Sequence, residues 1–266
     1  MVFNRLFCFI VFFSLARLCL AEDFRPFDGQ QPLLVAIETD PWAMVLGSDS
    51  PRVAIYENGD AVFVRGSGAS QGYYFTRLTP NELNGLLQQA RTALGSQGLK
   101  HRYDMGSATD QPMAKFYFYE AGSSMATEVY GLDCSPSSRF QRKSDSGQPP
   151  QALLDLNKSL CGLDVADSKK WVPRYVEVMM WDYGYAPGRS AFWPKDWPGL
   201  NSPRTIKRGD AYSIFLDGTM LPKLQSFLRG IGQKSATVID GKKMAVSYRY
   251  PFPSEPIWSK AFRSIE

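Results

Sequence analysis

Histidine, the side chain with the widest use in acid–base catalysis, occurs once in the chain, as His101 in LKHRYDMGS. A serine-type triad would have to use His101 as its base, with Asp104 or Asp110 orienting the ring. Ser190 does not supply the nucleophile, since its segment GRSAF lacks the final glycine of a G-x-S-x-G turn. A lone histidine in a polar loop is typical of an ordinary surface residue, so we predict no catalytic residue here.

Metal ligands are also scarce. A zinc site needs three or four histidine, cysteine or acid ligands, which a chain with one histidine does not readily supply. Calcium is the alternative, because scattered acids such as Asp155, Asp164 and Asp167 would serve if the fold brought them together. The spacing of an EF-hand loop is absent, so we expect no metal and no cofactor.

Glycoside cleavage needs only two carboxylates at a set separation, which sequence spacing does not report. Glu177 and Asp182 bracket an expected strand and are the pair we would choose. An odd number of residues separates them, so a regular strand would point them to opposite faces. This geometry argues against the pair.

The densest group of possible binding residues lies in WDYGYAPGRSAFWPKDWPGL, residues 181–200. In one interpretation, exposed rings and their polar neighbours grip a sugar face or the apolar patch of a partner. The residues that would do so are Trp181, Tyr183, Tyr185, Arg189, Trp193, Lys195 and Trp197. In the other, a long loop covers the core with its own rings, which the rigid pairs Trp193-Pro194 and Trp197-Pro198 favour.

The chain begins like a secretory precursor. Arg5 precedes the apolar run LFCFIVFFSLA, and a small-residue cleavage site ends at Ala21. A membrane span needs about 20 apolar residues, so a retained anchor is the weaker alternative. A lipoprotein is disfavoured because Cys19 follows Leu18 instead of a small residue. We expect export to the periplasm or beyond, and a mature chain from about Glu22 with no stable membrane insertion.

Two cysteines, Cys134 and Cys161, remain after residues 1–21 are removed. In an oxidising compartment such a pair most simply forms one disulfide. The bond would close a loop through the polar, Pro/Gly/Ser-rich segment 135–150, which buries little by itself. The alternatives, a cysteine nucleophile or a metal thiolate, would need a reduced sulfur and further partners.

The charge balance identifies no partner. Cleavage removes Arg5 and Arg17 from 30 basic residues and none of the 26 acidic residues, which leaves a net charge of +2. The charges are dispersed instead of forming a basic stripe, so we expect no nucleic-acid partner.

The first half predicts strands, a helix, a hairpin and a second helix in that order. Strands are expected at 33–38, 52–57 and 61–65 and in YYFTRL. Asn58-Gly59 marks the turn of a hairpin. Thr79 and Glu82 form a capping box before an amphipathic helix that ends at Gly95. The hairpin AKFYFYEAGSSMATEVYG and a short helix near 150–160 follow.

The second half repeats this plan in outline. Two strands, RYVEVMMWDY and AYSIFL, precede a helix at about 218–230 and a hairpin that turns at Asp240-Gly241. YFTRLTPNELNGLLQQA aligns without gaps on YSIFLDGTMLPKLQSFL, so that Tyr74 falls on Tyr212. Amphipathic spacing alone also produces such matches, so a duplicated ββαββ unit is one of two interpretations.

The predicted class is α+β, with antiparallel β-hairpins and two main helices packed on the sheet. The order of elements lacks a regular βαβ alternation, which argues against a Rossmann-type nucleotide site. We divide the chain into a signal peptide (1–21), a first α+β half with the disulfide loop (22–168) and a second α+β half (169–266). A pseudo-repeat would place both halves in one compact domain.

Three segments, PRVAIYENG, LTPNELNGLL and GKKMAVSYRYPFPSEPIW, resemble parts of uncharacterised exported bacterial proteins of similar length. The resemblance implies export and an α+β fold, and it carries over no activity.

We therefore predict an exported non-catalytic binding protein, inhibitor-like or immunity-like, that recognises another envelope or extracellular protein. The motivation is a secreted, disulfide-linked scaffold with one histidine, no nucleophile motif and no metal ligand set. The alternative is a carbohydrate-binding or glycan-hydrolysing protein that uses the aromatic stretch 181–200 with nearby acids. A purely structural envelope component is a third possibility.

Overall fold

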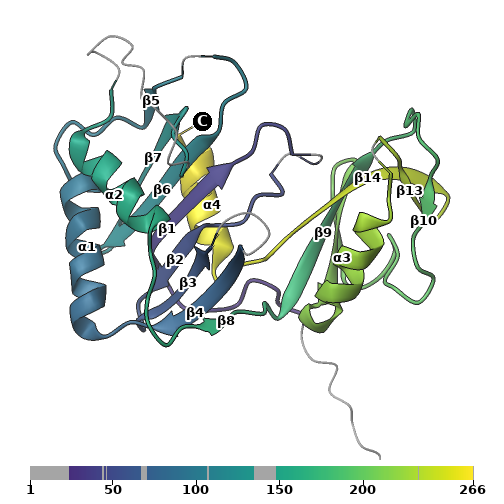
Figure 1. The fold of residues 1–266 in the computed structure, drawn as a ribbon, viewed down its shortest axis with the longest axis horizontal. Coiled ribbons are helices and arrows are strands. Elements are labelled where there is room, and N and C mark those ends of the chain that lie inside the picture. Colours follow the sequence, from purple (N-terminus) through teal and green to yellow (C-terminus); the bar gives the residue numbers. More distant parts are fainter. Residues whose placement is uncertain are drawn as a thin grey trace, which may run out of the picture.

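The computed structural model describes residues 24–43, 45, 47–66, 71–106, 108–134, 148–232 and 234–265. The expected signal peptide and most of the segment 135–150 lie outside the described residues. The fold is α+β, as predicted, with two β-sheets and four α-helices that form two lobes (Figure 1). In the described part of the chain, no helix is both long and apolar enough to cross a bilayer.

The first lobe is built on an eight-stranded sheet with the order β5-β7-β6-β1-β2-β3-β4-β8. Its strands are β1 (Pro32–Thr39), β2 (Val53–Tyr56), β3 (Asp60–Arg65), β4 (Gly72–Arg77), β5 (Arg102–Asp104), β6 (Met113–Glu120), β7 (Ser123–Tyr130) and β8 (Lys169–Lys170). Neighbouring strands are antiparallel, except that β5 runs parallel to β7. Asn58-Gly59 forms the β2–β3 turn, and Gly59 has a φ of 82°, which suits glycine.

Helices α1 (Pro80–Leu94) and α2 (Gln151–Cys161) cover one face of this sheet. The capping box of α1 is present, because the Glu82 amide donates to Thr79 Oγ1 at 3.3 Å and the Thr79 amide donates to Glu82 Oε2 at 2.8 Å. A disulfide joins Cys161, at the end of α2, to Cys134 just after β7. The predicted pairing of these two cysteines is thus confirmed.

The opposite face of the first sheet is covered by the C-terminal helix α4 (Glu255–Arg263). Trp258 and Phe262 pack there against strand residues such as Val35 and Tyr117 (Figure 1). We did not predict this helix, because prolines fill the segment before it. Pro256 lies in its first turn, where the missing amide hydrogen is not needed.

The second lobe is a six-stranded sheet with the order β10-β13-β14-β9-β12-β11. Its strands are β9 (Tyr175–Asp182), β10 (Ala191–Phe192), β11 (Thr205–Arg208), β12 (Ala211–Asp217), β13 (Thr237–Ile239) and β14 (Lys242–Arg249). A 3-10 turn (η3, Gly218–Met220) leads into α3 (Leu221–Arg229), which covers one face through Leu224 and Phe227. Asp240 and Gly241 make the predicted turn between β13 and β14.

The two halves differ in how their hairpins join the sheets. The hairpin after α1 meets the rest of its sheet through its first strand, β6, whereas the hairpin after α3 does so through its second strand, β14. The duplicated ββαββ unit is therefore not confirmed. Two segments from beyond residue 168, β8 and α4, belong to the layers of the first lobe.

The N-terminal segment and the β1–β2 loop connect the lobes. Phe24 packs edge-on against Tyr175 and Phe215, and Phe27 contacts Phe215 at 5.8 Å between ring centroids. The Tyr250 amide donates to Ser50 Oγ at 2.8 Å. The contacts of Phe24 and Phe27 lie on the side of the second sheet that α3 does not cover, because Tyr175 and Phe215 alternate with the strand residues on which α3 packs.

Candidate functional site

The aromatic stretch 181–200 does not form one surface. Trp193 is buried and packs edge-on against Trp197 and Phe227, with ring centroids 4.9 and 5.7 Å away. Its indole nitrogen donates to the Pro198 carbonyl at 3.0 Å. Trp193 and Trp197 thus pack beneath α3, which matches the interpretation of the stretch as a loop that covers the core.

The other predicted residues point elsewhere. Trp181 alternates with the buried Met180, so it lies on the face opposite α3 and is half-buried. Tyr183 and Tyr185 stack edge-on with centroids 5.0 Å apart, and Tyr185 is 82% exposed. Arg189 and Lys195 are exposed on either side of β10. The seven residues are therefore divided between two faces of the second sheet and its end.

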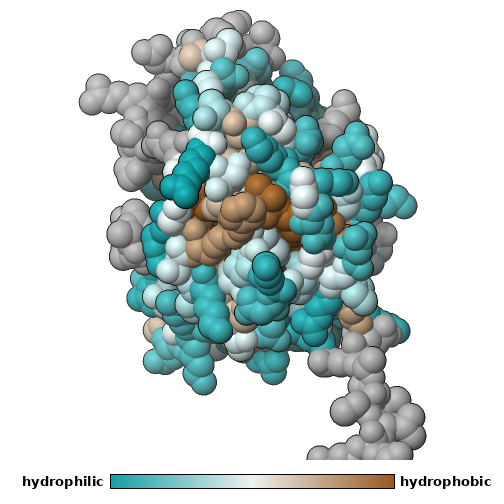
Figure 2. Space-filling model, turned by 90° about the vertical axis from the view of Figure 1, so that its right-hand side faces the viewer, coloured by the Kyte–Doolittle hydropathy of each residue, from teal (hydrophilic) through white to brown (hydrophobic). Residues whose placement is uncertain are grey.

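An apolar patch lies at the outer edge of the second sheet, on the face opposite α3. Trp193 and Ile239 pack under α3, so their neighbours Phe192 and Val238, which pair across β10 and β13, point to the other side. Phe192 is 78% exposed. Figure 2, which views this end of the molecule, shows apolar side chains gathered in its centre and hydrophilic ones around them. We call Phe192 and Val238 the β10 patch.

Basic side chains flank the β10 patch. Lys243 on β14 pairs with Val238 and is exposed. Arg189 and Lys195 precede and follow β10 in the chain. The patch thus has the Lys243 side chain beside it in the sheet, and two further exposed cations, Arg189 and Lys195, lie close to it in the chain.

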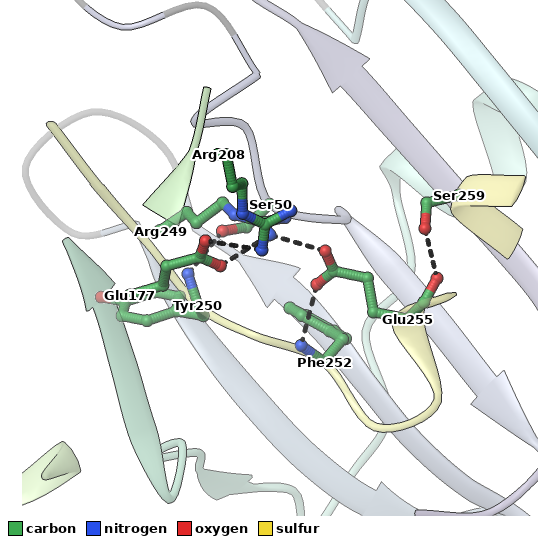
Figure 3. Close-up of polar contacts among 8 residues, drawn as sticks. All are labelled: Ser50, Glu177, Arg208, Arg249, Tyr250, Phe252, Glu255 and Ser259. Atoms are coloured by element: carbon green, nitrogen blue, oxygen red, sulfur yellow. Dashed lines mark hydrogen bonds and ion pairs between the residues drawn. The ribbon is translucent and has the colours of Figure 1, made fainter. Parts of the chain in front are cut away.

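A buried charge cluster lies where the two lobes meet (Figure 3). Arg249 at the end of β14 places Nη2 2.6 Å from Glu177 Oε2 and 2.6 Å from Glu255 Oε1. Arg208 Nη2 lies 3.4 Å from the other oxygen of Glu177. Glu255 begins α4, so Arg249 ties the second sheet to the helix that covers the first sheet. Two carboxylates and two guanidinium groups balance one another.

The cluster does not present a carboxylate pair to a substrate. Glu177 and Glu255 are buried and bonded to the same guanidinium. Burial raises the pKa of Glu255 above its ordinary value, and the attraction of Arg249 only partly opposes this. Asp182 is exposed and pairs with Met244, which packs under α3, so it lies on the face opposite Glu177. The predicted geometry of that pair is confirmed.

A cleft of about 730 Å³ opens between the lobes, next to the buried cluster. Its walls include four rings, two hydroxyl side chains and two glutamines. The lining residues with these groups are Tyr73, Trp171, Tyr248, Tyr250, Ser50, Thr219, Gln71 and Gln225. Clefts of this size between structural units are typical sites for small molecules.

A second hollow, of about 780 Å³, lies between α4 and the segment after α1, and His101 is on its wall. The His101 side chain is exposed, and its ring makes no ion pair with Asp104 or Asp110 in the described structure. Asp104 instead accepts from the Gly106 amide at 2.8 Å. Among the described residues, no group of three or more histidine, cysteine or acidic side chains is placed to hold a metal ion.

No family model, no curated protein and no solved structure matches this chain.

Three features of the site were not predicted from the sequence. We named Trp193 as a binding candidate and did not name its neighbour Phe192. Two successive residues of a strand point to opposite faces, so this signal was present in the sequence. Arg249 was read as part of a strand, and nothing local indicates that two glutamates distant in sequence surround it. The cleft joins residues from positions 50 to 250, which no sequence spacing reveals.

Proposed function

We propose that the protein is an exported, non-catalytic binding protein that recognises another protein through the β10 patch, as an inhibitor or immunity protein does. The observation that carries the proposal is Phe192, a large apolar side chain held 78% exposed on a sheet edge. A contiguous exposed apolar patch with a polar rim is typical of an interaction surface. Burying one such ring contributes about 2 kcal/mol to association.

The backbone of β10 adds to this surface. The Ala191 amide donates to the Ala236 carbonyl just before β13 and the Trp193 amide to the Val238 carbonyl, at 2.9 Å each, so the amide and carbonyl of Phe192 point away from the sheet. Strand β10 is the last in the sheet order, and no described strand lies beyond it. A partner that buries the Phe192 ring would also meet a free backbone donor and acceptor.

The charges around the patch specify the kind of partner. Lys243, Arg189 and Lys195 are exposed and positive, so an acidic surface on the partner complements them. Exposed charges of this kind accelerate association and lose their effect as salt rises.

Export of the protein rests on the signal-peptide pattern of residues 1–21, and the disulfide is compatible with it. That the protein resides in the periplasm or is secreted is part of the same proposal.

The alternative of a glycan held by residues 181–200 would depend on Trp181, Tyr183 and Tyr185, because Trp193 and Trp197 already pack under α3. We prefer protein recognition, since Phe192 is exposed beside Val238 and its ring has no polar group to bond a sugar.

The test uses oxidised mature protein, residues 22–266, as bait. It is incubated with envelope and secreted fractions, and the proteins that it retains are identified. Ile257→Ala is the matched control, because Ile257 is an exposed apolar residue on α4 in the other lobe. The wild type and Ile257→Ala should retain the same acidic protein in stoichiometric amount, with weaker retention at raised salt. Phe192→Ala should weaken its retention by tenfold or more. Equal retention by both variants would contradict the proposal.

A further inference from the structure

The outer edge of strand β7 is covered along only part of its length. Strand β5 pairs with residues 128–130, at the end of β7. The Glu128 amide donates to the His101 carbonyl at 2.9 Å. The Tyr130 carbonyl accepts from the Met105 amide, also at 2.9 Å. The even-numbered residues of β7 thus direct their backbone groups outward, and the odd-numbered ones direct theirs to β6.

The first half of β7 has outward backbone groups that no strand covers. By the same alternation, the amides and carbonyls of Ser124 and Ala126 point away from β6. In the part of the chain that the structure describes, no hydrogen bond is made to these groups. An extended chain laid along this edge would accept from both amides and donate to both carbonyls.

The open edge forms the floor of the hollow of about 780 Å³ described above, through residues 124–126. One wall is the end of α1 and the segment after it, with Leu94 and Leu99. The other wall is α4, with Ile257 and Ala261. These walls belong to the helical layers on opposite faces of the first sheet (Figure 1). The hollow, which we call the β7 slot, is therefore a strand position between two layers, in line with β5.

Strand β5 sets the length of an occupant. An added strand must end where β5 begins, at Arg102, because β5 takes the next position along β7. The open residues 123–127 of β7 span roughly 16 Å at about 3.3 Å per residue. A peptide of about five residues fills this length.

The two walls determine which side chains the occupant needs. Successive side chains of an added strand would point to the two walls in turn. Leu94 and Leu99 give the α1 side an apolar surface, and Ile257 and Ala261 give a second one on the α4 side. Apolar side chains buried on both sides would offset the entropy that a short peptide loses on binding.

The β7 slot favours a negative charge on its occupant. Lys260 is exposed on the α4 wall, and no aspartate or glutamate is among the described residues that line the slot. Two acids of the adjoining strands already have cationic partners. Glu120 at the end of β6 pairs with Arg91. Glu128 is buried, with Arg102 Nη1 3.1 Å from its carboxylate. An acidic side chain of the occupant on the α4 side would therefore complement Lys260.

We propose that the β7 slot binds a short extended peptide, of about five residues, as an added strand of the first sheet. The peptide backbone pairs with Ser124 and Ala126, its apolar side chains pack on the two walls, and an acidic side chain faces Lys260. Main-chain hydrogen bonds give such a complex its affinity, and alternate side chains give it specificity. The ligand is a short peptide and not a folded protein, so this site is separate from the β10 patch in the other lobe.

The first test uses oxidised mature protein and a library of acetylated pentapeptides of valine, leucine and threonine with one glutamate at a varied position. The tightest-binding sequence is then N-methylated at each backbone amide in turn. Methylation should weaken binding tenfold or more at the amides that bond to β7, and twofold or less at those between them. The reason is that only alternate amides of a strand face its neighbour. Equal effects at all positions would overturn the proposal.

Two pairs of variants test the contacts on the protein. Ala126→Pro removes the outward amide without removing a bond to β6, and the matched Ala126→Val keeps this amide. Ala126→Pro should bind the peptide tenfold more weakly than Ala126→Val, with thermal unfolding as the check that both fold. Lys260→Gln should abolish an about threefold preference for the glutamate peptide over its glutamine form. Arg263→Gln should not, because Arg263 is exposed on α4 outside the slot lining.

Two further outcomes would overturn the proposal. The first is that no pentapeptide of the library binds. The second is that the protein forms a dimer that Ala126→Pro dissociates, which would assign the slot to a second copy of the chain. Phe192→Ala should leave peptide binding unchanged, so this experiment and the capture experiment fail independently of each other.

Discussion

The two sheets are covered to different extents by their own chain. Both faces of the first sheet carry helices, α1 and α2 on one side and α4 on the other. The second sheet has α3 on one face only. Its other face is covered near the lobe boundary by Phe24 and Phe27, and it stays open at β10. The described residues thus form three hydrophobic core clusters for four sheet faces, and the exposed Phe192 lies on the fourth face.

This difference separates residues that are buried within the fold from residues that remain exposed on it. In the first lobe, apolar strand residues on both faces are buried beneath helices, so their replacement should lower stability. At β10, adjacent residues belong to the two classes, with Trp193 inside and Phe192 outside.

The largest effect is expected at the joint between the lobes. Arg249→Met leaves Glu255 buried without its cation and should lower the free energy of unfolding by about 3–5 kcal/mol, measured by urea denaturation at neutral pH. Arg208→Met should cost about 1 kcal/mol or less, because the Arg208 side chain is 48% exposed. Equal losses would show that the buried cluster does not hold α4 in place.

Two adjacent residues of β10, Trp193 and Phe192, test the difference between the covered face and the open face of the second sheet. Trp193→Ala removes a buried ring and its hydrogen bond to Pro198, and it should cost about 3–5 kcal/mol. Phe192→Ala should change stability by about 0.5 kcal/mol or less, because the ring is exposed. Thermal unfolding of the two variants measures both. A large loss in Phe192→Ala would mean that the ring has a structural role after all.

Removing the disulfide should act on the first lobe. The bond closes a loop with a sequence separation of 27 residues, so Cys134→Ala with Cys161→Ala should lower the free energy of unfolding by about 3–4 kcal/mol. Hydrogen exchange should then quicken in β6 and α2 more than in β9 and β12 of the second lobe. Uniform quickening in both lobes would show that they unfold as one unit.

The smallest effect is a pH dependence at the lobe boundary. Burial raises the pKa of Glu255 above its ordinary value of 4.5. The folded chain then holds this proton more tightly than the unfolded chain, so the free energy of unfolding falls as pH rises from about 4.5 through the folded value. Glu255→Gln should flatten this part of the stability profile. If the free energy of unfolding falls with pH equally steeply in Glu255→Gln and in the wild type, the pH dependence does not come from Glu255.

Local signals were sufficient to predict most of the elements. Asn58-Gly59 and Asp240-Gly241 predicted two turns, and the capping box at Thr79 predicted the start of α1. Helix α4 was missed because prolines precede it, and β10 and β11 were missed because they are too short to show alternation.

The site itself was only partly predictable. Arg189 and Lys195 were named as binding candidates and are exposed beside β10. The division of the rings between two faces depends on where β10 pairs with β13, which is a contact distant in sequence. The cluster around Arg249 was unpredictable for the same reason, because its partners lie in β9 and α4, distant from it in sequence.

The most direct test of the central claim, recognition of a partner through the β10 patch, is site-specific photo-crosslinking in disulfide-intact protein mixed with envelope and secreted fractions. A photoreactive phenylalanine analogue replaces Phe192 in one sample and Ile257 in another, and both positions are exposed. The account predicts a single crosslinked protein partner from position 192 and none from position 257. The same products from both positions, or none from position 192, would contradict recognition through the β10 patch.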